Sequence, residues 1–363
     1  MTSDAVTFHP LTVADVRPES DDSVAITFSV PEHLEDTFAW TPGQHVIVRA
    51  MIGGEDVRRS YSICSPAGSG PLRVGVKRIP GGVFSTFATS DLAVGDVLDV
   101  APPVGEFTRD PEPGVSGRYV AIAAGSGITP VLSIVASTLE QEPGSSFTLL
   151  YGNRTSRSIM FLDDVEALKD RFPDRFQVVH VLSREPHDVP LFEGRIDAAK
   201  LSSLLDTLVD PDGVDDWYLC GPFGLVEDAR AVLADRGVPE DAIHDELFFD
   251  ERFEPPPPPP VDAEGMATVR ITLDGRTSQV LVDPDGAPIL DYARTVRAEV
   301  PFACKGGMCA TCKAVVTEGE VRMDKNYALT DQEREAGLVL TCQSHPVTDD
   351  VALSYDVHGG IGR

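Results

Sequence analysis

The chain has 363 residues, of which 42% are hydrophobic, and a formal net charge of −28. This length exceeds one ordinary hydrophobic core, so we expect two or three folded domains. The strong negative charge argues against nucleic acid and against an anionic membrane surface as partners. There is no membrane-length apolar run and no recognisable secretory signal, and reduced cysteines are expected, so the sequence predicts a cytoplasmic protein.

The first region, residues 1–112, is expected to form an antiparallel β-barrel or sandwich. Short runs rich in β-branched residues alternate there with turn clusters containing glycine and proline. The expected strands are residues 11–16, 24–30, 45–50, 72–77 and 97–100.

Two motifs in this region are suited to a flavin nucleotide. In the first, Arg59 offers a fork of donors for a pyrophosphate, Tyr61 offers a flat face for a ring, and the Ser62 hydroxyl could reach the edge of that ring. The second motif, residues 81–85 (GGVFS), allows backbone amides to approach phosphate. Either motif alone is common, but their order on one β-rich domain favours a flavin site.

The second region, residues 113–250, changes its hydrophobic period and predicts a parallel sheet with flanking helices. The expected strands are residues 119–124, 147–151, 177–182 and 217–219, and the expected helices are residues 131–139, 160–171, 198–208 and 223–233.

A glycine-rich turn joins the first of these strands to the first helix. Strand, turn and helix in this order cradle phosphate at a helix N-terminus. Here Pro130 stands in place of a third glycine and is expected at the first helical position, which also suits a helix without any ligand. The residues of this turn that point to a nucleotide are Gly125, Gly127, Thr129 and Pro130.

Ligands of such sheets bind at the carboxyl ends of the strands. Arg154, Arg157 and Arg184 follow strand ends and are candidates for a ribose 2′-phosphate, with solvated surface arginines as the alternative. Cys220 could be a nucleophile, but its place at a strand end before Gly221 and Pro222 favours a wall of the nicotinamide site. Cys64 is expected to be a buried thiol.

Residues 251–265 contain six consecutive prolines and predict a stiff linker, whose prolines span about 19 Å at about 3 Å per residue. The last region, residues 266–363, is expected to hold a small sheet with a helix across it. The expected elements are strands at residues 267–273, 277–282 and 314–316, a strand around Cys342, a helix at residues 289–297 and a helical turn at residues 331–336.

This last region carries a C-x4-C-x2-C motif at Cys304, Cys309 and Cys312, and Cys342 follows later. The spacing is typical of plant-type [2Fe–2S] sites, because three thiolates on one tight loop can wrap two irons. Structural zinc usually shows two close cysteine pairs, and disulfides need an oxidising compartment, so both alternatives are weaker. The sequence therefore predicts an iron–sulfur cluster, with zinc as the main alternative.

The order of flavin motif, nicotinamide motif, linker and cluster motif resembles the ferredoxin–NADP⁺ reductase superfamily fused to a plant-type ferredoxin, as in oxygenase reductases. Residues 8–13, 151–156, 304–307 and 326–329 are similar to the reductase subunits of bacterial phenylacetyl-coenzyme A epoxidases. The resemblance implies three domains: a FAD-binding antiparallel β-barrel, an α/β parallel-sheet nicotinamide domain and an α+β β-grasp ferredoxin domain.

The resemblance also implies roles for particular residues. FAD would be bound by Arg59, Tyr61, Ser62, Gly82, Val83 and Ser85, with Phe248 covering the other face of its ring. NADPH, or alternatively NADH, would be bound by Gly125, Gly127, Thr129, Pro130, Arg154, Cys220, Gly221 and Pro222. Of these residues, Tyr61, Ser62, Cys220 and Phe248 would take part in hydride transfer, and Cys304, Cys309, Cys312 and Cys342 would ligate the cluster.

The expected activity is electron transfer from NADPH through FAD and the cluster to a di-iron oxygenase in a transient complex, by a protein that is a monomer on its own. A reductase of a steroid or aromatic-ring hydroxylase has the same domain order. A non-enzymatic redox sensor is a further alternative, although a sensor would have no need of the nicotinamide motifs.

Overall fold

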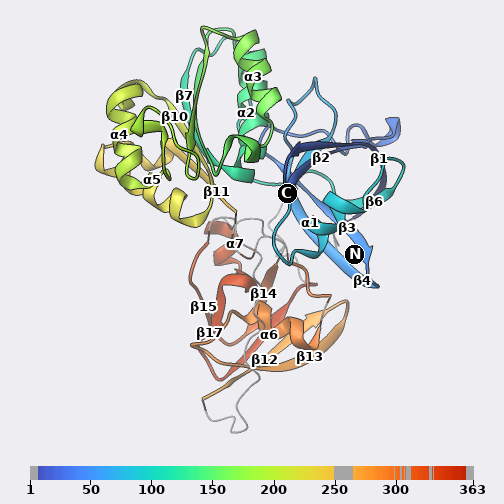
Figure 1. Cartoon of the computed structure of the whole chain (residues 1–363). Coiled ribbons are helices and arrows are strands. Elements are labelled where there is room, and N and C mark those ends of the chain that lie inside the picture. Colours follow the sequence, from blue (N-terminus) through green and yellow to red (C-terminus); the bar gives the residue numbers. More distant parts are fainter. Residues whose placement is uncertain are drawn as a thin grey trace. The chain divides into compact units, whose positions relative to one another are not determined.

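The computed structural model describes residues 7–248, 265–297, 299–302, 305, 307, 312–326, 329 and 331–356. The chain divides into two compact units, residues 9–250 and residues 251–363 together with the first eight residues. The first unit contains an antiparallel β domain followed by an α/β domain, and the second contains a small α+β domain (Figure 1). Among the described residues, no helix is both long enough and apolar enough to span a membrane.

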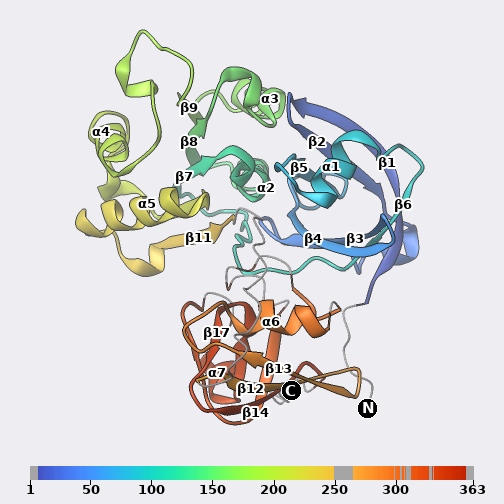
Figure 2. The same ribbon diagram turned by 60° about the horizontal axis from the view of Figure 1, so that its bottom comes forward.

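The β domain is a six-stranded antiparallel sheet with the strand order β4-β3-β6-β1-β2-β5. A bridge between Ile63, directly after β4, and Val74 of β5 joins the two ends of the sheet and closes it into a barrel (Figure 2). Inward-facing side chains of the strands and Phe84 of α1 fill its interior. The elements are β1 (His9–Ser20), β2 (Ser23–Ser29), η1 (Glu32–Leu34), β3 (His45–Ile52), β4 (Glu55–Ser62), β5 (Arg73–Lys77), α1 (Val83–Ser90) and β6 (Val97–Val100).

The α/β domain has a five-stranded parallel sheet with the order β11-β10-β7-β8-β9. Helices α2 and α3 cover one face, and α4 and α5 cover the other (Figure 1). The elements are β7 (Arg118–Ala124), η2 (Gly125–Gly127), α2 (Ile128–Gln141), β8 (Ser146–Asn153), η3 (Ser156–Ser158), α3 (Leu162–Arg171), β9 (Phe176–Leu182), η4 (Pro190–Phe192), α4 (Ala198–Leu208), η5 (Pro211–Gly213), β10 (Asp216–Gly221), α5 (Phe223–Asp235), η6 (Glu240–Ala242) and β11 (Ile243–Leu247).

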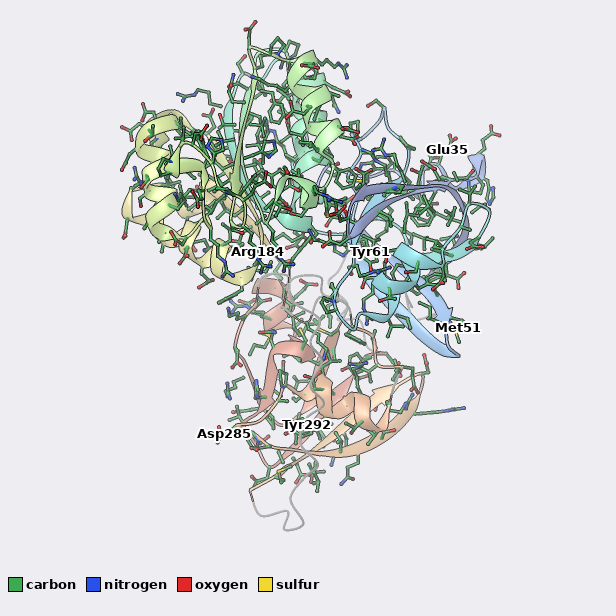
Figure 3. The ribbon with its side chains drawn as sticks, in the orientation of Figure 1. Glu35, Met51, Tyr61, Arg184, Asp285 and Tyr292 are labelled. Atoms are coloured by element: carbon green, nitrogen blue, oxygen red, sulfur yellow. The ribbon has the colours of Figure 1, made fainter. Side chains whose placement is uncertain are left out.

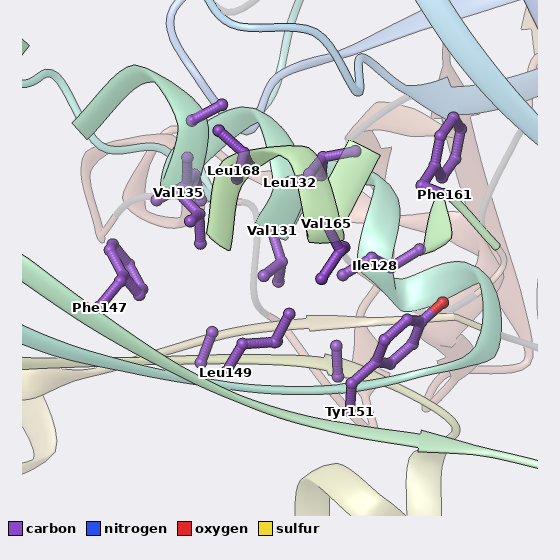
Figure 4. Close-up of a cluster of buried hydrophobic side chains, with 14 of the residues drawn as sticks. Ile128, Val131, Leu132, Val135, Phe147, Leu149, Tyr151, Phe161, Val165 and Leu168 are labelled. Atoms are coloured by element: carbon purple, nitrogen blue, oxygen red, sulfur yellow. The ribbon is translucent and has the colours of Figure 1, made fainter. Parts of the chain in front are cut away.

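The core of this domain lies between the sheet and the helices α2 and α3. Phe147, Leu149 and Tyr151 alternate along β8 and point toward Ile128 and Val131 of α2 (Figure 4). Burying each such side chain contributes about 1.5–3 kcal/mol. The continuous apolar face of α2 therefore fixes the helix on the sheet and, with it, the turn at its N-terminus.

The second unit holds a five-stranded sheet with the order β13-β12-β18-β14-β16, a small ribbon of β15 and β17, and the helices α6 and α7. Ile289, Leu290 and Ala293 of α6 are fully buried against this sheet. The elements are β12 (Ala267–Leu273), β13 (Arg276–Val282), α6 (Ile289–Val296), β14 (Lys313–Glu318), β15 (Val321–Met323), α7 (Asp331–Glu335), β16 (Leu338–Leu340), η7 (Thr341–Gln343), β17 (Ser344–Pro346) and β18 (Asp350–Ser354).

Two local expectations were wrong. Cys342 lies not on a strand but on the single turn η7 between β16 and β17, where the chain leaves one strand and enters the next. Pro130 is not the first helical residue, because α2 already begins at Ile128. The proline is still tolerated, since amides in the first helical turn have no partner within the helix.

Candidate functional site

The flavin motif of Arg59, Tyr61 and Ser62 lies on β4, which pairs with β3 and contacts α1. Tyr61 pairs with Val46 across the strands, and its ring packs against Phe84 of α1 with 5.3 Å between ring centroids. Tyr61 lies at the end of the β3–β4 hairpin nearer to the α/β domain, whereas Met51 lies at the opposite end (Figure 3). The half-buried Tyr61 ring and the N-terminus of α1 therefore come together at one place on the barrel.

The second motif forms the turn that precedes α1. Gly81 has a positive φ of 79°, which favours glycine, and a Cβ on Gly82 would lie 2.4 Å from Ser85 Oγ, so a larger residue there would displace the Ser85 hydroxyl. Ser85 Oγ accepts a hydrogen bond from the amide of Ile79 at 3.2 Å and so holds the turn in place. The first amides of α1 have no partners within the helix, and Val83 is exposed beside them, which suits a pyrophosphate.

The glycine turn of the α/β domain packs closely against the end of β10. A Cβ on Gly127 would lie 2.2 Å from the carbonyl oxygen of Cys220, so only glycine permits this approach. Gly125 has a positive φ of 54°, and its carbonyl accepts a hydrogen bond from Tyr151 Oη at 3.0 Å. Thr129 Oγ1 donates to the carbonyl of Ser126 at 2.9 Å, which braces the turn from within.

Four predicted residues meet at the carboxyl end of β10. Cys220 and Gly221 end the strand, Pro222 caps α5, and the amide of Phe248 donates to the carbonyl of Gly221 at 3.0 Å. Burial, with Glu246 and Asp245 nearby, raises the pKa of the Cys220 thiol well above its ordinary value. The thiol is therefore protonated at neutral pH and unsuited to nucleophilic attack.

The candidate 2′-phosphate arginines lie at the ends of β8 and β9. The amide of Arg184 donates to the carbonyl of Arg154 at 2.8 Å, which brings these two exposed residues together at the end of the α/β domain (Figure 3). Arg157 instead forms an ion pair with Asp21 of the barrel at 3.1 Å. Of the three arginines, the backbone thus brings Arg154 and Arg184 together.

Glu246 is a site residue that sequence reasoning missed. It lies on β11 directly beside Cys220 of β10, and Ser62 Oγ donates to its Oε2 at 3.3 Å across the two domains of the unit. His45, the cross-strand partner of Ser62, places its Nδ1 4.0 Å from Oε1 of the same carboxylate. The only signal in the sequence was the place of Glu246 two residues before Phe248, and nothing in the sequence pointed to His45.

The polar groups here fit a bound flavin. His45 Nε2 and Ser60 Oγ are buried and have no hydrogen-bond partner among the described residues. An unpaired buried polar atom is costly, so a ligand that supplies the missing bonds would be favoured. The turn at Gly82, the half-buried ring of Tyr61 and these two unpaired atoms all belong to the β-barrel domain, so one domain carries all the groups that fit a flavin.

In the second unit the structure describes two of the four predicted cluster ligands, Cys312 and Cys342, and both are buried. The carbonyl of Cys312 accepts hydrogen bonds from the amide and hydroxyl of Thr341, at 3.2 and 2.9 Å, which ties the two cysteine segments together. Cys304 and Cys309 lie outside the described residues.

Two residues of the cluster loop have left-handed backbone angles. Lys305 has φ of 54° and Gly307 has φ of 81°, as expected of a loop that turns tightly. Gln343, next to Cys342, donates from Nε2 to the carbonyl of Lys305 at 2.8 Å. The side chain of Gln343 therefore joins the loop to the segment of Cys342, the predicted fourth ligand, and this arrangement fits a four-thiolate site.

Comparison with known proteins decides the family. Three family models match the chain: an oxidoreductase FAD-binding domain over residues 10–108, an oxidoreductase NAD-binding domain over residues 121–231 and a 2Fe-2S iron-sulfur cluster binding domain over residues 271–347. The chain is 44% identical to a component of the 1,2-phenylacetyl-CoA epoxidase of Escherichia coli, over 97% of this chain and 99% of that protein. It belongs to the FAD- and [2Fe–2S]-containing oxygenase reductase family.

Other relatives agree with this assignment. The ferredoxin reductase component of 3-ketosteroid-9-alpha-monooxygenase from Rhodococcus rhodochrous is 32% identical over 95% of this chain and 96% of that protein. The solved structure of phthalate dioxygenase reductase matches the fold with a TM-score of 0.58 at 22% identity, over 98% of this chain and 100% of that one. The predicted fold class is confirmed, and so are the predicted FAD, [2Fe–2S] and nicotinamide cofactors of an oxidoreductase.

Proposed function

We propose that this oxidoreductase is the reductase of a phenylacetyl-CoA epoxidase and supplies a di-iron oxygenase with electrons from NADPH. The end-to-end identity of 44% to a component of such an epoxidase carries the proposal. When bound, FAD converts a two-electron hydride donor into a source of single electrons, and the cluster carries those electrons one at a time.

The residues of this chain supply binding and positioning. Tyr61 provides a ring face for the flavin, and Ser62 is held at its edge by Glu246. Phe248 and the protonated Cys220 form the wall on the nicotinamide side, because the hydrogen bond from Phe248 to Gly221 places both at one strand end. Arg59 and the turn at Gly82, Val83 and Ser85 bind the FAD phosphates, and the turn at Gly125, Gly127, Thr129 and Pro130 with Gly221 and Pro222 binds the nicotinamide nucleotide.

We propose that Arg154 and Arg184 give the preference for NADPH. The two exposed residues are adjacent through their backbones, and arginine binds phosphate in a bidentate manner. Replacing either with Ala should weaken NADPH binding about tenfold and leave NADH binding unchanged, since one charge-assisted hydrogen bond is worth about 1.5 kcal/mol. Arg157→Ala is the matched control, because its guanidinium is paired with Asp21.

The domain limits proposed from the sequence are residues 1–112, 113–250, 251–265 and 266–363. The three matched ranges, 10–108, 121–231 and 271–347, each lie within one of these domains. We further propose that Cys304, Cys309, Cys312 and Cys342 hold the cluster in a cytoplasmic protein, where thiols stay reduced. The protein is a monomer on its own and forms a transient complex with its oxygenase, as is usual for electron-transfer partners.

The test is anaerobic titration of the purified protein with NADPH and with NADH, followed by visible absorbance and EPR. Bleaching of the flavin, an EPR signal of a reduced [2Fe–2S] cluster, and a lower NADPH requirement support the proposal. The reduced protein is then mixed with purified phenylacetyl-CoA epoxidase or with a 3-ketosteroid hydroxylase. Turnover with the steroid enzyme alone would overturn the epoxidase assignment, and flavin bleaching without cluster reduction would overturn the order of transfer.

A further inference from the structure

His45 is buried where the barrel meets the α/β domain, and it belongs to neither of the flavin motifs. Its backbone amide and carbonyl both bond to Val104, at 2.9 Å each. The pair formed by His45 and Ser62 on the adjoining strand is thus a non-hydrogen-bonded pair, in which side chains lie closest. Register alone therefore places the imidazole beside the Ser62 hydroxyl on one face of the hairpin.

Both side chains face the carboxylate of Glu246. Ser62 Oγ donates to Oε2 at 3.3 Å, and His45 Nδ1 lies 4.0 Å from Oε1. The His45 and Glu246 side chains are only 4% and 13% exposed, so little water competes for these atoms. At 4.0 Å there is no direct hydrogen bond, but bonds in active sites are commonly long before ligands bind and tighten afterwards.

The surroundings of the neutral His45 imidazole favour its proton on one of the two ring nitrogens. Burial lowers the pKa of His45 to about 4, so the ring carries a single proton at neutral pH. Nε2 is buried and has no partner among the described residues, whereas Nδ1 faces a carboxylate oxygen. A buried N–H without an acceptor is costly, which favours the proton on Nδ1.

We propose that His45 is a positioning residue whose Nδ1–H holds Oε1 of Glu246, so that Oε2 stays on the Ser62 hydroxyl at the flavin edge. A carboxylate fixed at both oxygens keeps one orientation, and Ser62 then keeps its hydroxyl proton directed at Glu246. This inference rests on the proposed flavin site and adds to it the residue that orients its carboxylate.

The fit around the ring supports this role. A Cβ on Gly105 would lie 3.0 Å from His45 Nδ1, so glycine leaves the room that the imidazole needs on that side. Beside Glu246 on β10 lies the thiol of Cys220, whose pKa is raised by burial and, in part, by the charges of Glu246 and Asp245.

The first test is the tautomer of His45, read from ¹⁵N chemical shifts of the ring in the FAD-loaded, full-length protein at neutral pH. The signal is assigned by its loss in His45→Gln. We expect the proton on Nδ1 in the wild type and a shift toward Nε2 in Glu246→Ala, which removes the acceptor. A proton on Nε2 in the wild type, or the same tautomer in both proteins, would overturn the proposal.

The second test separates positioning from folding. His45→Leu should slow flavin reduction by NADPH about tenfold in stopped flow, the loss expected for one hydrogen bond to a charged group, with less than about a twofold change in NADPH affinity. His45→Gln, which keeps an N–H donor, should recover much of the rate, and the exposed His33→Gln in the same domain is the control. A wild-type rate in His45→Leu with full FAD content refutes the role, whereas loss of NADPH bleaching in the wild type itself refutes the proposed function.

Discussion

Glu142 is a buried carboxylate on which the connection between the barrel and the α/β domain depends. Its side chain is 0% exposed, and the residue follows the last residue of α2, where its backbone amide donates to the carbonyl of Thr138. Its oxygens accept hydrogen bonds from Arg109 Nη2 at 2.8 and 3.0 Å, from Ser145 Oγ at 2.6 Å and from the amide of Glu112 at 3.0 Å. Because Arg109 and Glu112 both lie in the segment between β6 and β7, one carboxylate anchors that whole segment.

Glu142→Gln keeps the size of the side chain but removes the charge opposite a guanidinium that is itself only 12% exposed. Breaking a buried ion pair by removing one partner costs about 3–5 kcal/mol. The amide oxygen still accepts some of the hydrogen bonds, so we expect the lower end, about 3 kcal/mol. Since 1 kcal/mol shifts the midpoint of a unit of this size by about 2–4 °C, the expected fall in Tm is about 6–12 °C.

The assay is thermal unfolding of the FAD-loaded protein, followed by flavin fluorescence and by far-UV circular dichroism. Glu140→Gln is the matched control: the same substitution at the same end of α2, at a carboxylate that is 18% exposed, accepts from Ser69 Oγ and pairs with Arg171, which is 60% exposed. A pair with one partner in solvent is worth about 0–1 kcal/mol, and the amide oxygen can still accept from Ser69. Equal shifts for the two variants, or no shift for Glu142→Gln, would refute the anchoring role of the buried pair.

Three further outcomes follow from the site. Gly127→Ala should weaken nicotinamide binding at least about tenfold, because its Cβ would meet the Cys220 carbonyl. Gly224→Ala, whose Cβ meets nothing within 4 Å, should leave binding unchanged, and equal binding by both variants would contradict the prediction. Cys220 should resist iodoacetamide at pH 8 in the folded protein and react only after unfolding; rapid labelling of the folded protein would show that its thiol is not held protonated. His45 has a folded pKa of about 4 against an ordinary 6.5, so the unfolded chain takes up the proton first and stability falls as the pH drops from 6.5 toward 4. At pH 5 this loss is about 2 kcal/mol and should be absent in His45→Gln, as urea unfolding at pH 7 and pH 5 can measure.

Elements with strong hydrophobic periodicity could be predicted from the sequence, and those with polar sequences could not. The helix expected at residues 198–208 and the strand expected at residues 267–273 match α4 and β12 residue for residue. The strand β11 (Ile243–Leu247) was missed because its sequence, IHDEL, has three polar residues in succession between its two apolar ends. It is an edge strand that pairs only with β10, so its polar side chains are tolerated there. Helix α1 was missed because the glycines before it suggested a phosphate-binding loop without a helix.

The residues that meet at the proposed hydride-transfer site could be found only in part, and the reason lies in how tertiary structure brings them together. Ser62 and Cys220 belong to recognisable local motifs, and a motif identifies its own residues. Glu246 reaches the same place through two tertiary contacts. It pairs with Cys220 across β10 and β11, and it accepts a hydrogen bond from Ser62, which lies 184 residues away in the chain. His45 reaches this place through the pairing of β3 with β4, which sets it opposite Ser62.

A local motif does not show these registers, although a shift of one residue would turn each side chain to the opposite face of its sheet. Register is fixed by the whole pattern of a strand and its partners, and on β3 the consecutive residues His45, Val46, Ile47 and Val48 are all buried, so no simple alternation shows which of them face the same side. A substitution in this pattern, far from the flavin, can therefore move His45 and Ser62 together and change the contacts of both with Glu246 at once. For this reason the carboxylate, His45 and Ser62 are expected to respond as one unit to mutation.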